Sequence, residues 1–257
     1  MVVVVLALAG GALAWIWGGA GADEASVDDA VRRFRAAQAG GDANPLQPAA
    51  GVYRYEGTGT ERLSVLGAHQ EWGSTIPVTV TTTGPGCWTV RIDYSTNHRQ
   101  ELDYCERDTR LLELGGRTRQ KFDFGAFSAD DTQEFVCDPP GVAAKIGAAP
   151  GDSWRQSCAG GSTTQHTKVV SAGPNTFLGV RSLRIGGKAV DAYVYRTDRT
   201  LSGDQSGREH DVMWFSVDTG LLLRYHRDSS VTSPSVVGTV EYRELGTMTA
   251  TALTPRR

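Results

Sequence analysis

No excess of charge of either sign marks this 257-residue chain, because 26 basic and 29 acidic residues leave a formal net charge of −3. Binding to nucleic acid needs a surplus of Lys and Arg on one face, so this balance excludes a nucleic acid as the partner. With 40% hydrophobic and 21% charged residues, the chain is too apolar and too weakly charged to be disordered. We therefore expect a folded domain that binds something other than DNA or RNA.

The short motifs of common enzyme and metal sites are also missing: there is no P-loop, GxGxxG, GxSxG, HExxH or EF-hand loop. No two histidines have H-x-H or H-x-x-x-H spacing, and solvated strand residues explain the local clusters at 69–71 and 209–211. Residues 151–154 contain the GDS sequence of some serine hydrolases, but they follow a proline rather than a strand-to-helix elbow. The sequence therefore predicts no cofactor, no metal site and no enzymatic activity, and a hydrolase that uses Ser153 is kept as an alternative.

An uncharged stretch of 21 residues covers positions 2–22. As a helix it would be about 31 Å long, enough to cross the hydrocarbon core of a bilayer. The small residues before Asp23 also fit a signal-peptide cleavage site, so an anchor and a signal peptide cleaved near Ala22 are both open. Because acidic residues follow and no Lys or Arg occurs before Arg32, the positive-inside rule places the rest outside the cytoplasm. We predict a single-pass protein of the cell membrane, attached through residues 2–22, with secretion after cleavage as the alternative.

All four cysteines lie downstream of this stretch, which favours two disulfides in an exported chain. Residues 87–105 can form a hairpin about Thr96 in which the numbers of paired residues sum to 192. One face is then apolar, and the other carries a cysteine pair and two oppositely charged pairs, which a slip of one residue would destroy. We predict a disulfide in this hairpin and, by elimination, a second one between Cys137 and Cys158. The predicted pairs are Cys87–Cys105, Trp88–Tyr104, Val90–Leu102, Arg91–Glu101 and Asp93–Arg99.

Two further hairpins are predicted from their turn residues. One covers residues 211–227 and places Met213 opposite Tyr225 and Phe215 opposite Leu223. The other turns at a Gly-Gly pair at 186–187, which is typical of a type I′ turn. Each hairpin has one apolar face, so one face of each sheet should be covered by other parts of the protein.

Only one amphipathic helix is expected before the strands begin. Ser26 and Asp29 form a capping-box pattern, and apolar residues recur at helical spacing from Val27 to Phe34. This helix and a linker are predicted over residues 23–50.

From residue 51 onward, short runs rich in Val, Thr, Tyr and Leu alternate with turn residues, which predicts about eleven strands. We assign residues 51–257 to a single β domain with a Pro/Gly-rich loop at 138–163. A sheet this wide with one short helix must curl, close or split into two layers. The predicted fold is therefore mainly β: a large curved antiparallel sheet, half-barrel or barrel-like, with one short N-terminal amphipathic helix, preceded by a transmembrane or signal helix.

Apolar side chains on the predicted inner faces are candidates for lining a ligand cavity, although an ordinary sheet core explains them as well. Cations at Arg117, Arg119 and Lys121 share one strand face, which could contact anionic lipid or an envelope polymer, or could be a solvated strand face. The candidate ligand-binding residues are Trp88, Val90, Ile92, Tyr104, Tyr193 and Trp214.

Several segments resemble known proteins: the helix VDDAVRRFRA followed by GVYRYEGTGTERLSVLG and GCWTV, and later PGDSW-x-x-x-C and WFSVDTGLLLRY. Together they resemble an uncharacterised family of actinobacterial envelope proteins with an N-terminal membrane segment. More loosely, a helix followed by a meander with an aromatic–Asp–Thr–Gly–Leu hairpin is similar to the LolA/LolB/LppX half-barrel group. That resemblance implies an acyl chain held between a curved sheet and helices.

The sequence therefore favours an extracytoplasmic, membrane-associated β domain that acts as a non-catalytic binding module. Its expected partners are the membrane and either a lipid-like or apolar ligand or an envelope protein. The alternative is a purely structural or protein-interaction domain of the cell envelope.

Overall fold

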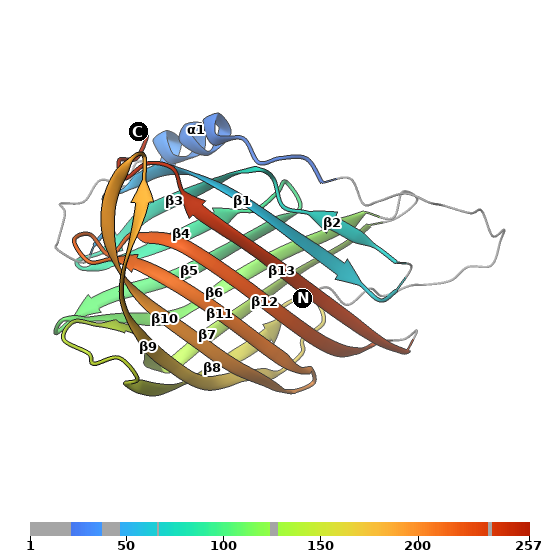
Figure 1. Cartoon of the computed structure of the whole chain (residues 1–257). Coiled ribbons are helices and arrows are strands. Elements are labelled where there is room, and N and C mark those ends of the chain that lie inside the picture. Colours follow the sequence, from blue (N-terminus) through green and yellow to red (C-terminus); the bar gives the residue numbers. More distant parts are fainter. Residues whose placement is uncertain (1–21, 38–46, 66, 124–127, 236–237) are drawn as a thin grey trace.

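The computed structural model describes residues 22–37, 47–65, 67–123, 128–235 and 238–257. All thirteen strands among these residues belong to one antiparallel sheet, in which β1 (Gly51–Leu63) pairs with β13 (Gly238–Ala250). This pairing closes twelve strands into a barrel, and the short β2 (His69–Glu71) lies beside β1 after the part that pairs with β3 (Thr75–Gly84) (Figure 1). The fold is mainly β with one short helix, as predicted, but the barrel is closed and is not a half-barrel. The other strands are β4 (Cys87–Asp93), β5 (His98–Arg107), β6 (Arg110–Asp123), β7 (Ser128–Lys145), β8 (Ser153–Ser162), β9 (Val169–Ile185), β10 (Lys188–Gly203), β11 (Ser206–Ser216) and β12 (Leu222–Ser235).

The hairpin registers follow the alternation of apolar and polar side chains along each strand. The β4–β5 hairpin has the predicted register at every pair from Cys87↔Cys105 to Asp93↔Arg99. The β11–β12 hairpin pairs Met213 with Tyr225 as predicted, but a bulge after Trp214 places Phe215 opposite Leu222. The predicted partner of Phe215 is therefore wrong by one residue, because a bulge inserts a residue that alternation alone does not reveal.

The long loop predicted at 138–163 is wrong over most of its length, because β7 continues through its two prolines to Lys145 and β8 begins at Ser153. Even so, β7 and β8 pair only from Gln133↔Ser162 to Cys137↔Cys158. The prolines explain why the ladder stops, since a proline has no N–H to donate to a neighbouring strand.

Side chains replace the missing ladder beyond this point. Asn175 Nδ2 donates to the carbonyl oxygens of Val142 at 2.7 Å and Ala143 at 3.0 Å. The hydroxyl of Tyr195 accepts from the backbone N–H of Lys145 at 2.8 Å. The end of β7 therefore keeps its ladder to β6, while side chains attach its other edge to β9 and β10.

The helix α1 (Val27–Ala37) lies on the outer side of the barrel, near β1 and β3 (Figure 1). Ser26 caps the helix as predicted, with the N–H of Asp29 donating to Ser26 Oγ at 3.3 Å. Ala30 and Val31 pack against Val52 of β1, which is fully buried. The helix thus covers outward-facing side chains, while the interior of the barrel is filled by the strands themselves.

No helix within the described residues is long and apolar enough to cross a membrane. On this finding, the predicted location as a single-pass protein of the cell membrane is corrected. Residues 1–21, which carry nearly all of the predicted anchor, lie outside the described residues. Secretion after cleavage near Ala22 stays a prediction.

The barrel interior consists of two apolar clusters separated by a polar layer. Along β12, Tyr225 belongs to the larger cluster and Val231 to the smaller one, and Arg227 and Ser229 lie between them. The same order holds along β13, where Glu244 lies between the two clusters. The side-chain period of two keeps these polar residues on the inward face, so they are buried together inside the barrel.

Both predicted disulfides are present, Cys87–Cys105 and Cys137–Cys158. Their sequence separations of 18 and 21 residues are almost the same. In the chain-entropy model each is therefore worth about 3 kcal/mol. They differ in what surrounds them, because β4 and β5 pair fully with their neighbours whereas β7 separates from β8 just after Cys137.

This contrast predicts that removing either disulfide lowers the global stability by a similar amount but changes the local structure differently. Replacing Cys137 and Cys158 by alanine should increase amide hydrogen exchange selectively in residues 138–152, which lack a ladder to β8. The matched control, alanine at Cys87 and Cys105, should lose similar global stability without a local increase there. Equal exchange at 138–152 in the two variants, measured by mass spectrometry, would contradict this account.

Candidate functional site

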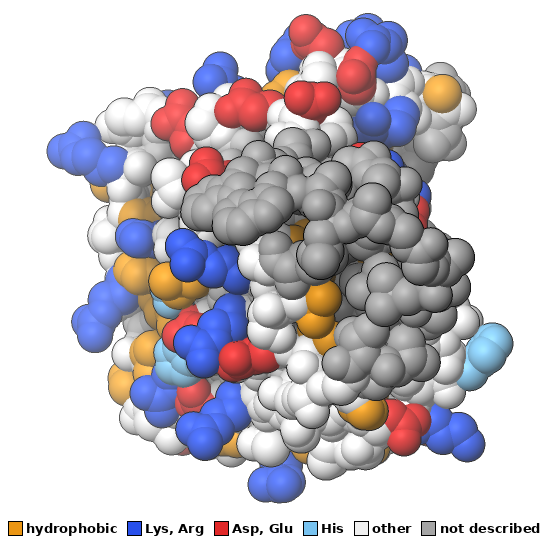
Figure 2. All heavy atoms as spheres, turned by 90° about the vertical axis from the view of Figure 1, so that its right-hand side faces the viewer, with side chains coloured by type: hydrophobic (Ala, Val, Ile, Leu, Met, Phe, Trp, Pro, Cys, Tyr) orange, Lys and Arg blue, Asp and Glu red, His pale blue; other side chains and the backbone are white. Residues whose placement is uncertain are grey.

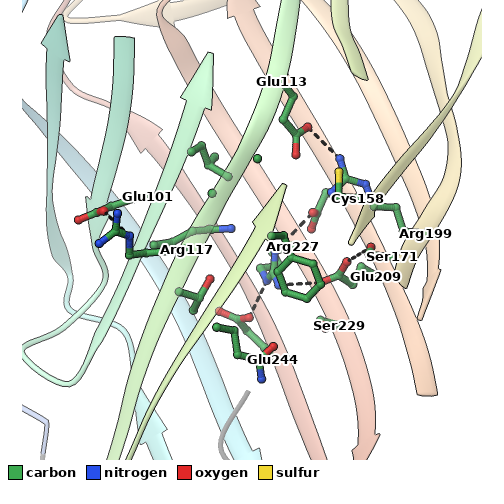
Figure 3. Close-up of a pocket in the computed structure, with 18 of the residues that line it drawn as sticks. Glu101, Glu113, Arg117, Cys158, Ser171, Arg199, Glu209, Arg227, Ser229 and Glu244 are labelled. Carbon is green, nitrogen blue, oxygen red and sulfur yellow. Dashed lines mark hydrogen bonds and ion pairs between the residues drawn. The ribbon is translucent and has the colours of Figure 1, made fainter. Parts of the chain in front are cut away.

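A cavity of about 100 Å³ lies in the polar layer of the barrel (Figure 3). A buried water needs about 10–15 Å³ of such space, so the cavity has room for several waters or a small polar group. Strands β5 to β13 all contribute to its wall. The buried or largely buried charged side chains in the wall are Glu113, Arg199, Glu209, Asp211, Arg227 and Glu244.

Arg227 of β12 is the centre of this wall. Its Nε donates to Glu244 at 2.6 Å, and one Nη donates to Glu209 at 3.1 Å. The other Nη donates to the hydroxyl of Tyr225 at 2.9 Å and, less closely, to Asp211 at 3.4 Å. Figure 3 shows these carboxylates converging on the guanidinium from neighbouring strands. A planar guanidinium with several fixed donors suits this role better than a lysine would.

A second guanidinium lies across the cavity. Arg199 of β10 donates to Glu113 of β6 at 2.8 Å, and both side chains are largely buried. Burial opposes the charge of Arg199, but Glu113 and Glu209 outweigh burial and raise its pKa above the ordinary value. Both arginines therefore carry a permanent charge inside the barrel.

A second cluster adjoins the cavity at Glu61 of β1, which is fully buried. His98 Nδ1 lies 2.6 Å from Glu61 Oε1, and the side-chain amides of Gln70 and Gln120 donate to Glu61 Oε2 at 2.8 Å and 2.9 Å. Burial opposes ionisation of Glu61, but His98 and these hydrogen bonds outweigh it and lower its pKa. Glu61 is therefore an ionised carboxylate in the barrel interior.

Carboxylates outnumber cations in this layer: Glu61, Glu113, Glu209, Asp211 and Glu244 face two guanidiniums and one imidazole. The titration of the carboxyl groups reflects this imbalance. Arg227 and Arg199 outweigh burial and lower the pKa of Glu209. For Asp211 burial dominates, with repulsion from Glu209 and Glu244, and its pKa rises to about 6. In the layer as a whole, negatively charged side chains therefore outnumber positively charged ones.

Several buried polar atoms around the cavity have no hydrogen-bond partner among the described residues. Buried polar groups are nearly always paired with protein or water, so unpaired ones indicate a place for another polar species. The atoms in the cavity wall are Gln120 Oε1, Arg199 Nε, Asp211 Oδ1, Ser229 Oγ and Glu244 Oε1. The arrangement can therefore accommodate waters, a cation or a small polar solute.

The predicted ligand-binding residues are mostly located elsewhere. Trp88, Val90 and Ile92 are buried in the larger apolar cluster, and Tyr104 of that cluster also lines the cavity. Tyr193 is only partly buried at the edge of this cluster. Trp214 lies under the guanidinium of Arg224, 5.9 Å from the ring centroid, and alternates with inward-facing Met213 and Phe215 on β11. Four of the six predicted residues thus lie together in the apolar core. The ligand-binding role of all six stays a prediction.

The other candidates have exposed or half-exposed side chains, although Arg117 is also among the residues that line the cavity (Figure 3). Ser153 is exposed, and its hydroxyl contacts Thr176 Oγ1 at 3.1 Å rather than a histidine. In the cationic group, Arg117 lies 3.3 Å from Glu101, and Arg119 contacts Asp130. Figure 2 shows Lys and Arg interspersed with Asp and Glu on the face that it displays. Anion binding at this group would therefore compete with existing ion pairs.

From the sequence, the charged cluster at 209–211 was interpreted as solvated strand residues, and its place in the barrel interior was not predicted. Glu209 and Asp211 share the inward face of β11 with Met213 and Phe215. Charged residues in phase with an apolar face are the signal that could have identified them. Without the closed barrel, however, the same positions read as the solvated end of a strand.

Comparison with known proteins gives no family: no family model and no curated protein matches this chain. A hypothetical lipoprotein, YmcC from Escherichia coli, aligns at 13% identity over 87% of this chain and 97% of its own, with a TM-score of 0.34. A presumed lipoprotein from Parabacteroides distasonis aligns at 10% identity over 82% and 99%, with a TM-score of 0.38. TM-scores this low do not establish a shared fold. The expected actinobacterial family is unsupported, and the strand pairings define the class: a closed antiparallel barrel with a buried charged layer.

The position of Arg227 predicts a large effect of its removal. Arg227→Met should destabilise the protein by about 3–5 kcal/mol, because it leaves buried carboxylates without their cation. Arg243→Met is the control, since Arg243 is exposed and pairs with the partly exposed Glu241, and it should cost about 1 kcal/mol or less. Similar losses for the two variants in urea denaturation would show that Arg227 is not the centre of the layer.

The pKa of Asp211 predicts a specific pH dependence. The pKa of Asp211 is about 6 in the folded protein, above the ordinary 3.8. As the pH rises, the Asp211 carboxyl therefore loses its proton at a lower pH in the unfolded chain than in the folded protein. The contribution of Asp211 to stability should therefore decrease between pH 3.8 and about 6 and then stay constant. Asp211→Asn removes this titration, so wild type should lose stability relative to the variant across that window. Chemical denaturation at several pH values measures the difference, and a constant difference would contradict the assignment.

Proposed function

We propose that this chain is an exported, non-catalytic binding module that takes a small polar or ionic ligand in the charged layer of its barrel. The observation that carries this proposal is the cavity wall: it combines an excess of buried carboxylates with unpaired buried polar atoms. Burying several charges without full compensation is costly, and a structural core of this size could be apolar instead. A ligand that satisfies these groups would explain why they are there.

Two features support the cellular setting. All four cysteines are paired in two disulfides, and stable disulfides form in oxidising compartments outside the cytoplasm. The pairing of β1 with β13 also leaves the sheet without two free end strands, which lowers its tendency to aggregate through open edges.

The size and charge of the cavity argue against the lipid-like or apolar ligand expected from the sequence. Sites for drug-sized apolar ligands usually have about 300–1,000 Å³, several times the volume of about 100 Å³ found here. The apolar side chains that could have lined such a site are packed against one another in the larger cluster. An acyl chain would have to displace this packing or lie against carboxylates.

The test is native mass spectrometry of the full chain isolated from its own envelope or medium. We expect any species that the protein retains to have the mass of a small solute, and we expect no bound fatty acid or phospholipid. Glu209→Gln should reduce retention, whereas Glu134→Gln, on a half-exposed outer side chain, should not. A stoichiometric lipid adduct, or a small adduct unaffected by Glu209→Gln, would contradict the proposal.

A second candidate function, binding of an envelope protein, is favoured by one observation on the outer surface. Val136, Ala159 and Val170 are exposed and lie directly opposite one another on β7, β8 and β9. Exposed apolar side chains grouped in this way are typical of contact surfaces. Val136→Asp would weaken such a contact without affecting the interior.

A further inference from the structure

Two buried carboxylates face each other where the barrel closes. Glu61 of β1 and Glu244 of β13 are directly opposite in the register, and their side chains are 0% and 2% exposed. Like charges directly opposite on adjacent strands repel, and burial strengthens the repulsion. Such a pair needs a positive species between its members.

His98 of β5 occupies that position. Its Nδ1 lies 2.6 Å from Glu61 Oε1 and 3.6 Å from Glu244 Oε1. These three atoms all lie within 4.8 Å of one another, and all three residues are buried. One imidazole nitrogen and two carboxylate oxygens therefore converge on a single point.

The other oxygen of each carboxylate is held by a separate donor. Gln70 and Gln120 donate to Glu61 Oε2 at 2.8 Å and 2.9 Å, and Arg227 donates to Glu244 Oε2 at 2.6 Å. This is the arrangement of supporting hydrogen bonds that orients metal ligands in proteins.

Two unpaired atoms point independently to a missing ligand. Among the described residues, Glu244 Oε1 has no hydrogen-bond partner, although it is buried and lies 3.6 Å from His98 Nδ1. Gln120 is 1% exposed and donates to Glu61 through Nε2, while its Oε1 in the cavity wall is likewise unpaired within the described part of the chain. Neither atom is accounted for by the hydrogen bonds within the cluster.

We propose that Glu61, His98 and Glu244 bind one divalent first-row transition metal ion of the zinc type. This deepens the proposed function, and rests on it, by naming the ligand of the charged layer. An imidazole with two carboxylates suits such ions, whereas calcium and magnesium prefer sites made of oxygen ligands alone. Of the three ligands, Glu244 also lines the cavity. The sequence predicted no metal site, since these ligands come from three strands far apart in the chain.

Binding of the ion replaces a hydrogen bond. His98 Nδ1 lies 2.6 Å from Glu61 Oε1, and ligand atoms of a tetrahedral zinc ion lie about 3.3 Å apart. The imidazole therefore moves slightly away from Glu61 and coordinates the ion as a neutral ligand, with its N–H on Nε2. With two carboxylates and a neutral imidazole, a divalent ion makes the site neutral.

Stacked rings hold His98 in place. Tyr94 lies against His98 with ring centroids 4.6 Å apart, and Trp72 stacks on Tyr94 at 4.2 Å. Trp72 in turn covers Gly59 and Gly246, where a Cβ would come within 2.2 Å and 2.5 Å of its ring. Glycine at both positions gives the indole the room that places the stack above the carboxylate pair.

The experiment uses the full chain, stripped of metal by a chelator and then titrated with Zn²⁺ in a calorimeter. We expect one ion per chain, and a Co²⁺ complex with the visible absorption of a low-coordinate site. His98→Asn and Glu244→Gln should each weaken Zn²⁺ binding by about 100-fold or more, since loss of a supporting hydrogen bond alone typically costs 10- to 100-fold. His210→Asn is the matched control, because it removes a half-exposed histidine that contacts Asp198 at 2.5 Å.

The outcomes separate this inference from the proposed function. Unsaturable Zn²⁺ binding, or unchanged affinity in a folded His98→Asn protein, overturns the metal site, while a small non-metal adduct in native mass spectrometry would still support the proposed function. If both ligand variants fail to fold, X-ray absorption of the wild-type zinc complex decides. One nitrogen with two or more oxygen neighbours supports the site, and any other ligand set overturns it.

Discussion

The ladder between β1 and β13 is the interaction on which the rest of this structure depends. It joins the first and last strands over the pairs from Tyr55↔Ala250 to Leu63↔Tyr242. Closing the ring removes the two open edges that a sheet of this length would otherwise expose. It also converts one face of every strand into an enclosed interior, so each inward side chain must be apolar or must find a partner.

That requirement explains how the interior is organised. The two apolar clusters contribute the hydrophobic stabilisation that is expected of a barrel core. The charged layer between them contributes less, because desolvating each ion offsets much of the attraction between partners. Arg227 limits this cost by contacting three carboxylates at once. The layer is therefore better understood as a functional feature than as a source of stability.

Closure also creates the site itself. Glu61 and Glu244 are 183 positions apart in the chain, yet the closing ladder places them opposite each other. His98 reaches them from β5, across the interior, and Arg227 holds the far side of Glu244. A half-barrel with the same strands would leave these carboxylates in solvent, where they would need no partner.

Much of the local structure was predictable from the sequence. The alternation in residues 87–105 determined a register and with it the disulfide Cys87–Cys105, because only one register satisfies both faces. The helix at Val27–Ala37 followed from its cap and its apolar spacing. Errors arose where backbone irregularity interrupts alternation, at the bulge before Phe215 and along the proline-containing β7.

The sequence by itself determined the mainly β class, the β4–β5 hairpin, the short helix and the two cysteine pairs, since these local features depend on neighbours within about twenty residues. Only the tertiary structure decided that the sheet closes, that Trp88, Val90 and Ile92 become core, and that Glu61, His98 and Glu244 meet. The physical reason is that a period of two specifies which side chains share a face but not whether that face is enclosed. Whether an in-phase glutamate is solvated or buried depends on a contact between the two ends of the chain.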